Sequence, residues 1–171
     1  INITKKVIEV AHAVGVSVEA ELGKIGGTED NVTVDEREAA FTDPDEAKLF
    51  VDETGVDYLA IAVGTAHGVY KGEPKLDFDR IKRIKELVGI PLVLHGSSGV
   101  PEDSIKKAVS LGINKINIDT DLRIAFTQAI RDYNEKNPKN IDPRKVLAPA
   151  KEAMKEVIKE KMHIFGSAGR A

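Results

Sequence analysis

Hydrophobic residues along this chain follow two alternating spacings. In residues 3–14 they recur every three or four positions, which predicts an amphipathic helix, and in residues 16–22 they occupy every second position, which predicts a strand. Glu19 and Glu21 share the polar face of that strand. Similar patterns predict strands at 58–64, 91–95 and 114–118 and helices at 44–54, 77–88, 101–112, 122–135 and 144–163. This alternation is typical of a parallel sheet covered by helices, so the predicted class is α/β.

The segment at about 23–43 has no such pattern. It is polar and contains glycines, and a long segment of this kind in a compact domain is often a functional loop. The four predicted strands are half of the eight in a (β/α)8 TIM barrel, which takes about 250 residues. We therefore expect residues 1–171 to form one globular unit corresponding to part of such a barrel, closed by C-terminal helices at about 122–163.

Polar residues that could take part in catalysis or bind a metal lie where the four predicted strands end. They are Glu21, His67, His95 and Asn117. In a (β/α)8 barrel the C-terminal ends of the strands aim their side chains at a common mouth, where catalytic residues gather. We therefore expect these four side chains to converge.

His67 and His95 are candidate metal ligands. The chain contains no cysteine, so any metal must be held by nitrogen and oxygen atoms. Both histidines follow strands and are followed by glycine, and neutral imidazole suits Zn²⁺, whose catalytic sites usually have three protein ligands. Glu21 is the candidate carboxylate. In the alternative interpretation both histidines are packing residues of another phosphate-binding barrel.

The segment Gly96-Ser97-Ser98-Gly99 is a candidate phosphate-binding loop. It joins a predicted strand to a helix that begins at Pro101, so backbone N–H groups and a helix N-terminus can face an anion. Phosphate sites in these barrels commonly follow the last two strands. Asn117 and Asp119 alternate with isoleucines after the next strand, which predicts that both polar side chains face the barrel mouth.

Charge and hydropathy narrow the range of partners. The net charge is −3 with basic and acidic residues interspersed, so we expect no nucleic-acid partner. The longest apolar stretch, at 58–63, is far shorter than the roughly 20 residues of a membrane helix, so we expect no membrane association and a cytoplasmic protein. The chain starts at Ile1 and enters a helical pattern directly, so we expect it to be a fragment.

Six motifs spread over essentially the whole chain resemble those of class II fructose-bisphosphate aldolases, in the same order. They are Val-Glu-Ala-Glu-Leu-Gly at 18–23, Gly-Gly-Thr-Glu-Asp at 26–30, Gly-Thr-Ala-His-Gly-Val-Tyr-Lys at 64–71, Leu-His-Gly-Ser-Ser-Gly at 94–99, Lys-Ile-Asn-Ile-Asp-Thr at 115–120 and Asp-Pro-Arg at 142–144. The resemblance implies the C-terminal half of such an enzyme, about the last four strands of its barrel and their helices.

The resemblance also implies roles for individual residues. His67 and His95 are expected to bind zinc, Glu21 to serve a second or shifted metal position, and Glu29 to assist proton exchange. Backbone carbonyls near His67 and Gly96 are expected to suit a monovalent cation, Na⁺ or K⁺. The residues expected to bind the substrate and its phosphates are Gly68, Lys71, Gly96, Ser97, Ser98, Asn117, Ile118, Asp119, Thr120 and Arg144.

The activity implied is the reversible cleavage of fructose 1,6-bisphosphate to dihydroxyacetone phosphate and glyceraldehyde 3-phosphate in glycolysis and gluconeogenesis, by a homodimer or homotetramer. Relatives have a third zinc histidine preceded by a catalytic aspartate, and no Asp-His pair occurs in this sequence. Ser97 stands where many relatives have glycine. We therefore expect this chain alone to be inactive. The alternatives are a tagatose-bisphosphate aldolase and a catalytically silent half-barrel that associates through its open sheet edges.

Overall fold

Strands and helices alternate along the chain in the computed structural model, which describes residues 1–29, 32–34, 40–70 and 72–170. The helices are α1 (Asn2–His12), α2 (Pro44–Thr54), α3 (Phe78–Val88), α4 (Glu102–Ser110), α5 (Thr120–Lys136) and α6 (Pro143–Ile164). The strands are β1 (Glu19–Leu22), β2 (Gly26–Glu29), β3 (Val32–Val34), β4 (Tyr58–Ile61), β5 (Ala66–His67), β6 (Leu92–Leu94) and β7 (Ile113–Ile116). All six predicted helices are present, with no end shifted by more than two residues.

The four strands predicted from the sequence form one sheet in the order β1-β4-β6-β7. Each neighbouring pair is parallel, with Glu21 beside Ala60, Leu59 beside Leu92, and Leu94 beside Ile116. Because strand order follows chain order and all strands point the same way, their C-terminal ends lie along one edge. This is the arrangement that the predicted barrel requires.

Local signals fix the ends of the helix that follows the first strand. Asp43 caps α2 by accepting hydrogen bonds from the backbone N–H groups of Asp45 and Glu46, and Pro44 occupies the first helical turn. Gly55 ends the helix with φ of 69°, a left-handed conformation that favours glycine. These signals explain why the prediction of 44–54 matches α2 at both ends.

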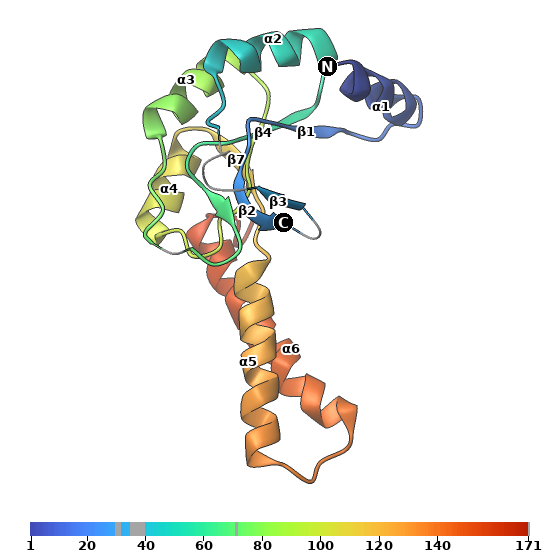
Figure 1. The fold of residues 1–171 in the computed structure, drawn as a ribbon, viewed down its shortest axis with the longest axis vertical. Coiled ribbons are helices and arrows are strands. Elements are labelled where there is room, and N and C mark those ends of the chain that lie inside the picture. The colour runs from blue at the N-terminus through green and yellow to red at the C-terminus, as the bar shows by residue number, and fades with distance from the viewer. Residues whose placement is uncertain (30–31, 35–39, 71, 171) are drawn as a thin grey trace. The chain divides into compact units, whose positions relative to one another are not determined.

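The hydrophobic core lies between the parallel sheet and the helices that follow its strands. Leu59, Ile61, Leu92 and Leu94 are fully buried in the two central strands. Helices α2, α3 and α4 lie along one side of the sheet (Figure 1) and bury apolar side chains on the sheet-facing surface. The buried side chains of these helices include Ala47, Phe50, Val51, Ile81, Ile84, Ile105 and Ala108.

A second sheet, in the order β3-β2-β5, was not predicted from the sequence. The segment 23–43 was expected to be loop, but it contains β2 and β3, which pair antiparallel, and β2 also pairs parallel with β5. These strands are two to four residues long and two of them contain or adjoin glycines, so they are too short to show the alternation by which strands are predicted. The pairing of Gly27 with His67 links this segment to a candidate metal ligand.

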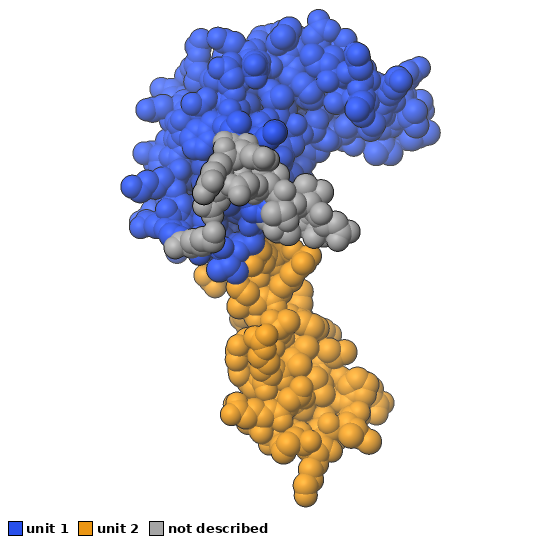
Figure 2. Space-filling model, viewed as in Figure 1, with its two compact units in different colours: residues 1–117 blue, residues 118–171 orange. Residues whose placement is uncertain are grey.

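The chain divides into two compact units, residues 1–117 and residues 118–171 (Figure 2). The first contains both sheets and α1 to α4. The second contains α5 and α6, and an ion pair of 2.7 Å between Lys161 and Asp121 joins the end of α6 to the start of α5. Within the described part of the chain, no helix combines the length and apolar character needed to cross a membrane.

Thr42 connects the ends of two parallel strands. Its side chain is almost completely buried, and its hydroxyl donates a hydrogen bond of 2.5 Å to the carbonyl oxygen of Leu22. The same hydroxyl accepts a hydrogen bond of 2.8 Å from the backbone N–H of Ala62. Thr42 therefore satisfies backbone groups at the ends of β1 and β4, close to the edge that carries the candidate site.

Replacing Thr42 by valine is expected to lower the free energy of unfolding by about 1–3 kcal/mol, because two buried backbone groups lose their partner while side-chain volume is kept. Urea denaturation of the chain measures this loss. Thr42→Ser retains the hydroxyl and is the matched control, expected to lose clearly less. Equal stability of Thr42→Val and the unchanged chain would contradict the assigned role.

Candidate metal centre

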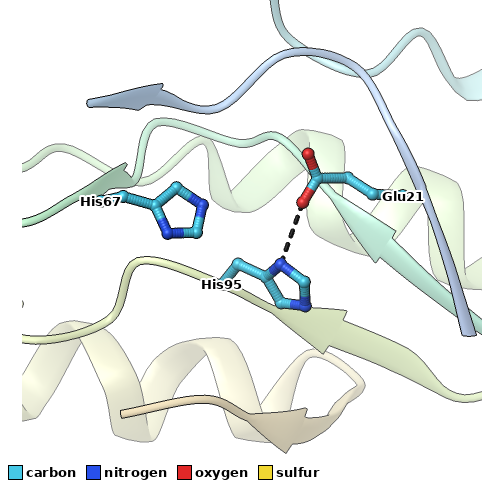
Figure 3. Close-up of side chains that lie close together, drawn as sticks. All are labelled: Glu21, His67 and His95. Atoms are coloured by element: carbon cyan, nitrogen blue, oxygen red, sulfur yellow. Dashed lines mark ion pairs between the residues drawn. The ribbon is translucent and has the colours of Figure 1, made fainter. Parts of the chain in front are cut away.

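Glu21, His67 and His95 bring three potential ligand atoms together. Glu21 lies in β1, His67 in β5, and His95 directly after β6. One ligand atom from each lies within 4.8 Å of the other two, and the imidazole rings are 6.0 Å apart between centroids with an interplanar angle of 77°. In Figure 3 the Glu21 carboxylate points toward His95, and the His67 ring faces the same space. The convergence expected for these three residues is therefore present.

Both ring nitrogens of His95 lie close to carboxylates. Its Nε2 atom forms a hydrogen bond of 2.9 Å with Glu19 Oε1. Its Nδ1 atom lies 2.9 Å from Glu21 Oε2, but the contact lacks hydrogen-bond geometry, and Nδ1 is buried without a hydrogen-bond partner. The neighbouring Glu21 carboxylate raises the pKa of His95, burial opposes this, and Glu19 reinforces it.

The donor set fits a divalent metal ion. Two imidazoles and a carboxylate are ligands that Zn²⁺ takes in many catalytic sites, where three protein ligands leave one position open. A buried polar atom without a hydrogen-bond partner is uncommon in folded proteins, and His95 Nδ1 is such an atom, 2.9 Å from the Glu21 carboxylate. Coordination of a cation would satisfy Nδ1.

Glu19 and Lys115 extend the cluster beyond the candidates singled out in the sequence. Glu19 Oε2 accepts a hydrogen bond of 2.6 Å from Lys115 Nζ. Burial alone would raise the pKa of Glu19, but Lys115 and His95 together lower it, so Glu19 is held as a carboxylate. The signal available in the sequence was the alternation that places Glu19 on the same strand face as Glu21.

The contact between Glu19 and Lys115 also indicates that the parallel sheet is curved. These residues belong to β1 and β7, the two outer strands, which a flat sheet would separate by about 14 Å. A hydrogen bond of 2.6 Å between their side chains requires a curved sheet with both side chains on its concave face. Curvature of this kind is what brings strand ends together in a barrel.

Two glycines allow the backbone at His67 to approach its neighbours closely. A Cβ atom on Gly27 would lie 2.1 Å from the His67 carbonyl oxygen, and one on Gly96 would lie 2.5 Å from the Ala66 carbonyl oxygen. Both glycines also have positive φ, 101° and 61°. No other residue fits at either position without moving the segment that carries His67.

Tyr70 holds the two histidine-bearing segments together. Its hydroxyl donates a hydrogen bond of 2.7 Å to the Gly96 carbonyl oxygen and accepts one of 2.7 Å from the backbone N–H of Ala66. Ala66 precedes His67 and Gly96 follows His95, so one hydroxyl sets the spacing between the two loops. The sequence offered no signal for this role, because a tyrosine in a loop has many possible partners.

The serine side chains of the loop Gly96 to Gly99 are less exposed than expected for a phosphate-binding loop. Ser97 and Ser98 are buried, and the Ser97 hydroxyl donates to the Leu94 carbonyl oxygen at 3.4 Å. The Ser97 side chain is therefore turned toward the strand before it. Backbone N–H groups remain as the groups through which this loop could contact an anion.

The segment 117–120 differs from its prediction. Strand β7 ends at Ile116, two residues earlier than expected, so Asn117 and Asp119 lie beyond the strand from whose alternation their orientation was predicted. The Asn117 backbone N–H donates to the Leu94 carbonyl oxygen at 3.1 Å, which continues the parallel pairing of Leu94 with Ile116. Ile118, Asp119 and Thr120 belong to the second unit, where Asp119 pairs with Arg123 at 2.8 Å.

The remaining predicted site residues are spread over the chain. Gly68 has φ of 90°, and a Cβ atom there would meet nothing within 4 Å. Arg144, in the second unit, is largely exposed and pairs with Asp142 at 2.9 Å. The backbone of Glu29 lies at the end of β2, but its side chain and all of Lys71 lie outside the described residues.

Comparison with known proteins decides the family. The model of the class II fructose-bisphosphate aldolase family matches residues 1–170. The chain belongs to this family. A curated fructose-bisphosphate aldolase from Thermus caldophilus is 53% identical over 191 aligned positions, which cover 98% of this chain and 63% of that protein.

Solved structures of this family share the fold. The YdjI aldolase from Escherichia coli K12 is 41% identical with a TM-score of 0.82, over 99% of this chain and 57% of that one. A fructose-bisphosphate aldolase from Campylobacter jejuni is 27% identical with a TM-score of 0.77, over 96% of this chain and 56% of that one. The predicted partial (β/α)8 barrel is confirmed, and the chain spans a little over half the length of these relatives.

Replacing Tyr70 by phenylalanine is expected to lower the free energy of unfolding by about 1–3 kcal/mol, because the Ala66 N–H and the Gly96 carbonyl lose their common partner. Burial raises the pKa of Tyr70 above the ordinary value of about 10. Its unfolded form therefore ionises first, and stability falls as the pH rises above that value.

The ultraviolet absorbance of the three tyrosines, followed against pH, should show one late phase that Tyr70→Phe removes. Tyr133→Phe, in the second unit, is the control and should keep that phase. A late phase that persists in Tyr70→Phe would contradict the assignment.

Proposed function

We propose that this chain carries the zinc-binding and phosphate-binding part of a class II aldolase that cleaves fructose 1,6-bisphosphate to dihydroxyacetone phosphate and glyceraldehyde 3-phosphate. The observation that carries the proposal is the approach of His67, His95 and Glu21 to within 4.8 Å at the C-terminal edge of a parallel sheet. The family match and the fructose-bisphosphate aldolase name of the Thermus caldophilus relative support the reaction.

His67 and His95 would hold the zinc ion, and Glu21 would serve as its carboxylate ligand or hold a second, shifted metal position. Zinc bound there would supply Lewis-acid chemistry, polarising a ketose carbonyl and stabilising negative charge beside it. The protein would contribute the fixed distance between the two imidazoles, set by Tyr70 and by the glycines at 27 and 96. Glu29 would exchange a proton with the substrate.

The sugar phosphate would bind at the ends of β6 and β7. Strand β6 is followed by Gly96, Ser97 and Ser98, and strand β7 is followed by the segment 117–120. Loops after the last two strands are the usual phosphate site of such barrels. Gly68 and Lys71 would complete this site, and Arg144 would bind the second phosphate. A monovalent cation, Na⁺ or K⁺, would use carbonyl oxygens near His67 and Gly96, although the Gly96 carbonyl already accepts the Tyr70 hydroxyl.

The activity, in glycolysis and gluconeogenesis, would belong to the whole protein of which this chain corresponds to part. No Asp-His pair occurs in the sequence, so the third zinc histidine and the catalytic aspartate expected of this family are not supplied here. We propose a cytoplasmic homodimer or homotetramer without nucleic-acid or membrane partners. The outer strands β1 and β7 of the parallel sheet carry edges that the rest of a barrel would pair.

Zinc titration of this chain tests the metal centre. We expect binding through His67, His95 and Glu21 that is much weaker than in the complete enzyme, because one histidine ligand is missing. Isothermal titration calorimetry with Zn²⁺ should show the heat of binding abolished in His67→Ala and in His95→Ala.

His163→Ala is the matched control, since His163 lies in α6 of the second unit. Its zinc affinity should equal that of the unchanged chain. Zinc binding that survives the loss of both His67 and His95 would overturn the metal assignment.

The complete enzyme that contains this segment is expected to cleave fructose 1,6-bisphosphate with a higher kcat/KM than tagatose 1,6-bisphosphate. Coupled detection of triose phosphate measures both rates, and the isolated chain should produce none because it lacks the catalytic aspartate. A preference for the tagatose ester would replace the proposed substrate by its epimer. Activity of the isolated chain would contradict the proposed incompleteness.

A further inference from the structure

The two ring nitrogens of His95 face two different carboxylates. Nε2 is aligned with Glu19 Oε1 in a hydrogen bond of 2.9 Å, whereas Nδ1 lies 2.9 Å from Glu21 Oε2 without hydrogen-bond geometry. A neutral imidazole carries one N–H, and an ionised carboxylate can only accept. Because only the Glu19 contact is aligned, the proton belongs on Nε2, and the lone pair of Nδ1 then faces Glu21, one of the three clustered residues.

Lys115 fixes the orientation of the Glu19 carboxylate. Its ammonium group donates to Glu19 Oε2 at 2.6 Å, so each oxygen of the Glu19 carboxylate has a donor. The side chains of Glu19 and His95 are mostly buried, 24% and 15% exposed, which limits competition from water. Lys115, Glu19 and His95 thus form a chain of charge-assisted hydrogen bonds across the concave face of the sheet.

Glu19 stands outside the set of ligands. The three residues whose ligand atoms cluster are Glu21, His67 and His95, and both oxygens of Glu19 are directed elsewhere. A group that accepts a hydrogen bond from the N–H on the other ring nitrogen of a metal-binding histidine orients the ring and fixes its tautomer. Its loss typically weakens metal affinity by about 10–100-fold. The position of Glu19 matches that role.

We propose that Glu19 is a positioning residue that holds His95 as the Nε2–H tautomer, so that Nδ1 is presented to the metal, and that Lys115 holds Glu19 in the orientation this requires. The proposal rests on the metal centre proposed above and adds to it the reason why one nitrogen of His95 is available. Without Glu19, the Glu21 carboxylate beside Nδ1 would draw the proton to that atom.

The replacement Glu19→Gln gives the sharpest test, because Lys115 can only donate. The new amide should turn its carbonyl toward Lys115 and its NH₂ group toward Nε2, which makes Nε2 an acceptor and moves the ring proton to Nδ1. We expect the zinc affinity to fall about 10–100-fold. In the double variant Glu19→Gln/Lys115→Met the carbonyl is free to accept from Nε2–H, so part of the affinity should return.

Nitrogen-15 NMR of the His95 ring in the metal-free chain, at a pH where the ring is neutral, reads the tautomer independently of zinc binding. The unchanged chain should show the proton on Nε2, Glu19→Gln should show it on Nδ1, and the double variant should revert toward Nε2. Glu53→Gln is the matched control, since Glu53 pairs with Lys5 at 2.7 Å in the same unit and neither residue belongs to the metal centre. It should change neither tautomer nor affinity.

The outcomes separate this proposal from the metal assignment. A proton on Nδ1 of the unchanged chain overturns the role of Glu19, whether or not any variant folds. If His95→Ala abolishes zinc binding while Glu19→Gln alters neither tautomer nor affinity, the metal centre stands and the role of Glu19 is refuted. If His95→Ala leaves zinc binding unchanged, the metal centre itself is wrong.

Discussion

Curvature of the parallel sheet is the constraint on which the candidate metal centre depends. Side chains from the outer strands β1 and β7 meet at Glu19 and Lys115, which a flat sheet would keep apart. The same curvature lets Glu21 on β1 reach His95, which follows β6, although β4 lies between these strands. A sheet bent in this way concentrates polar side chains on its concave face while the convex face packs against α2, α3 and α4.

The second requirement is close backbone approach around His67. This residue belongs to a two-residue strand outside the parallel sheet, and its position is set by glycines on both sides and by the Tyr70 hydroxyl. Fixed backbone spacing lets two imidazoles face one ion without further rearrangement. Charge is then balanced locally, because Lys115 neutralises Glu19 and leaves the Glu21 carboxylate for the proposed cation.

The sequence predicted the parallel sheet and its helices well, because both depend on local periodicity. Caps such as Asp43 with Pro44 mark helix ends within a few residues, so α2 could be predicted at both ends. Prediction from the sequence failed for strands that pair with segments far away along the chain. Strand β2 pairs with β3 and with β5, and β5 lies more than 30 residues further along the chain. The strand expected at 114–118 ends at Ile116, and helix α5 begins at Thr120.

The sequence alone determined which ligand types this protein can offer and the order in which strands present them, since composition and side-chain period are local properties. Glu21, His67 and His95 could therefore be named in advance. Only the tertiary structure decided that Glu19 takes the Nε2 side of His95, that Lys115 holds Glu19, and that Tyr70 joins the two histidine segments. Each of these contacts joins residues 26 or more positions apart, and their partners follow from the curvature of the sheet and not from any neighbouring residue.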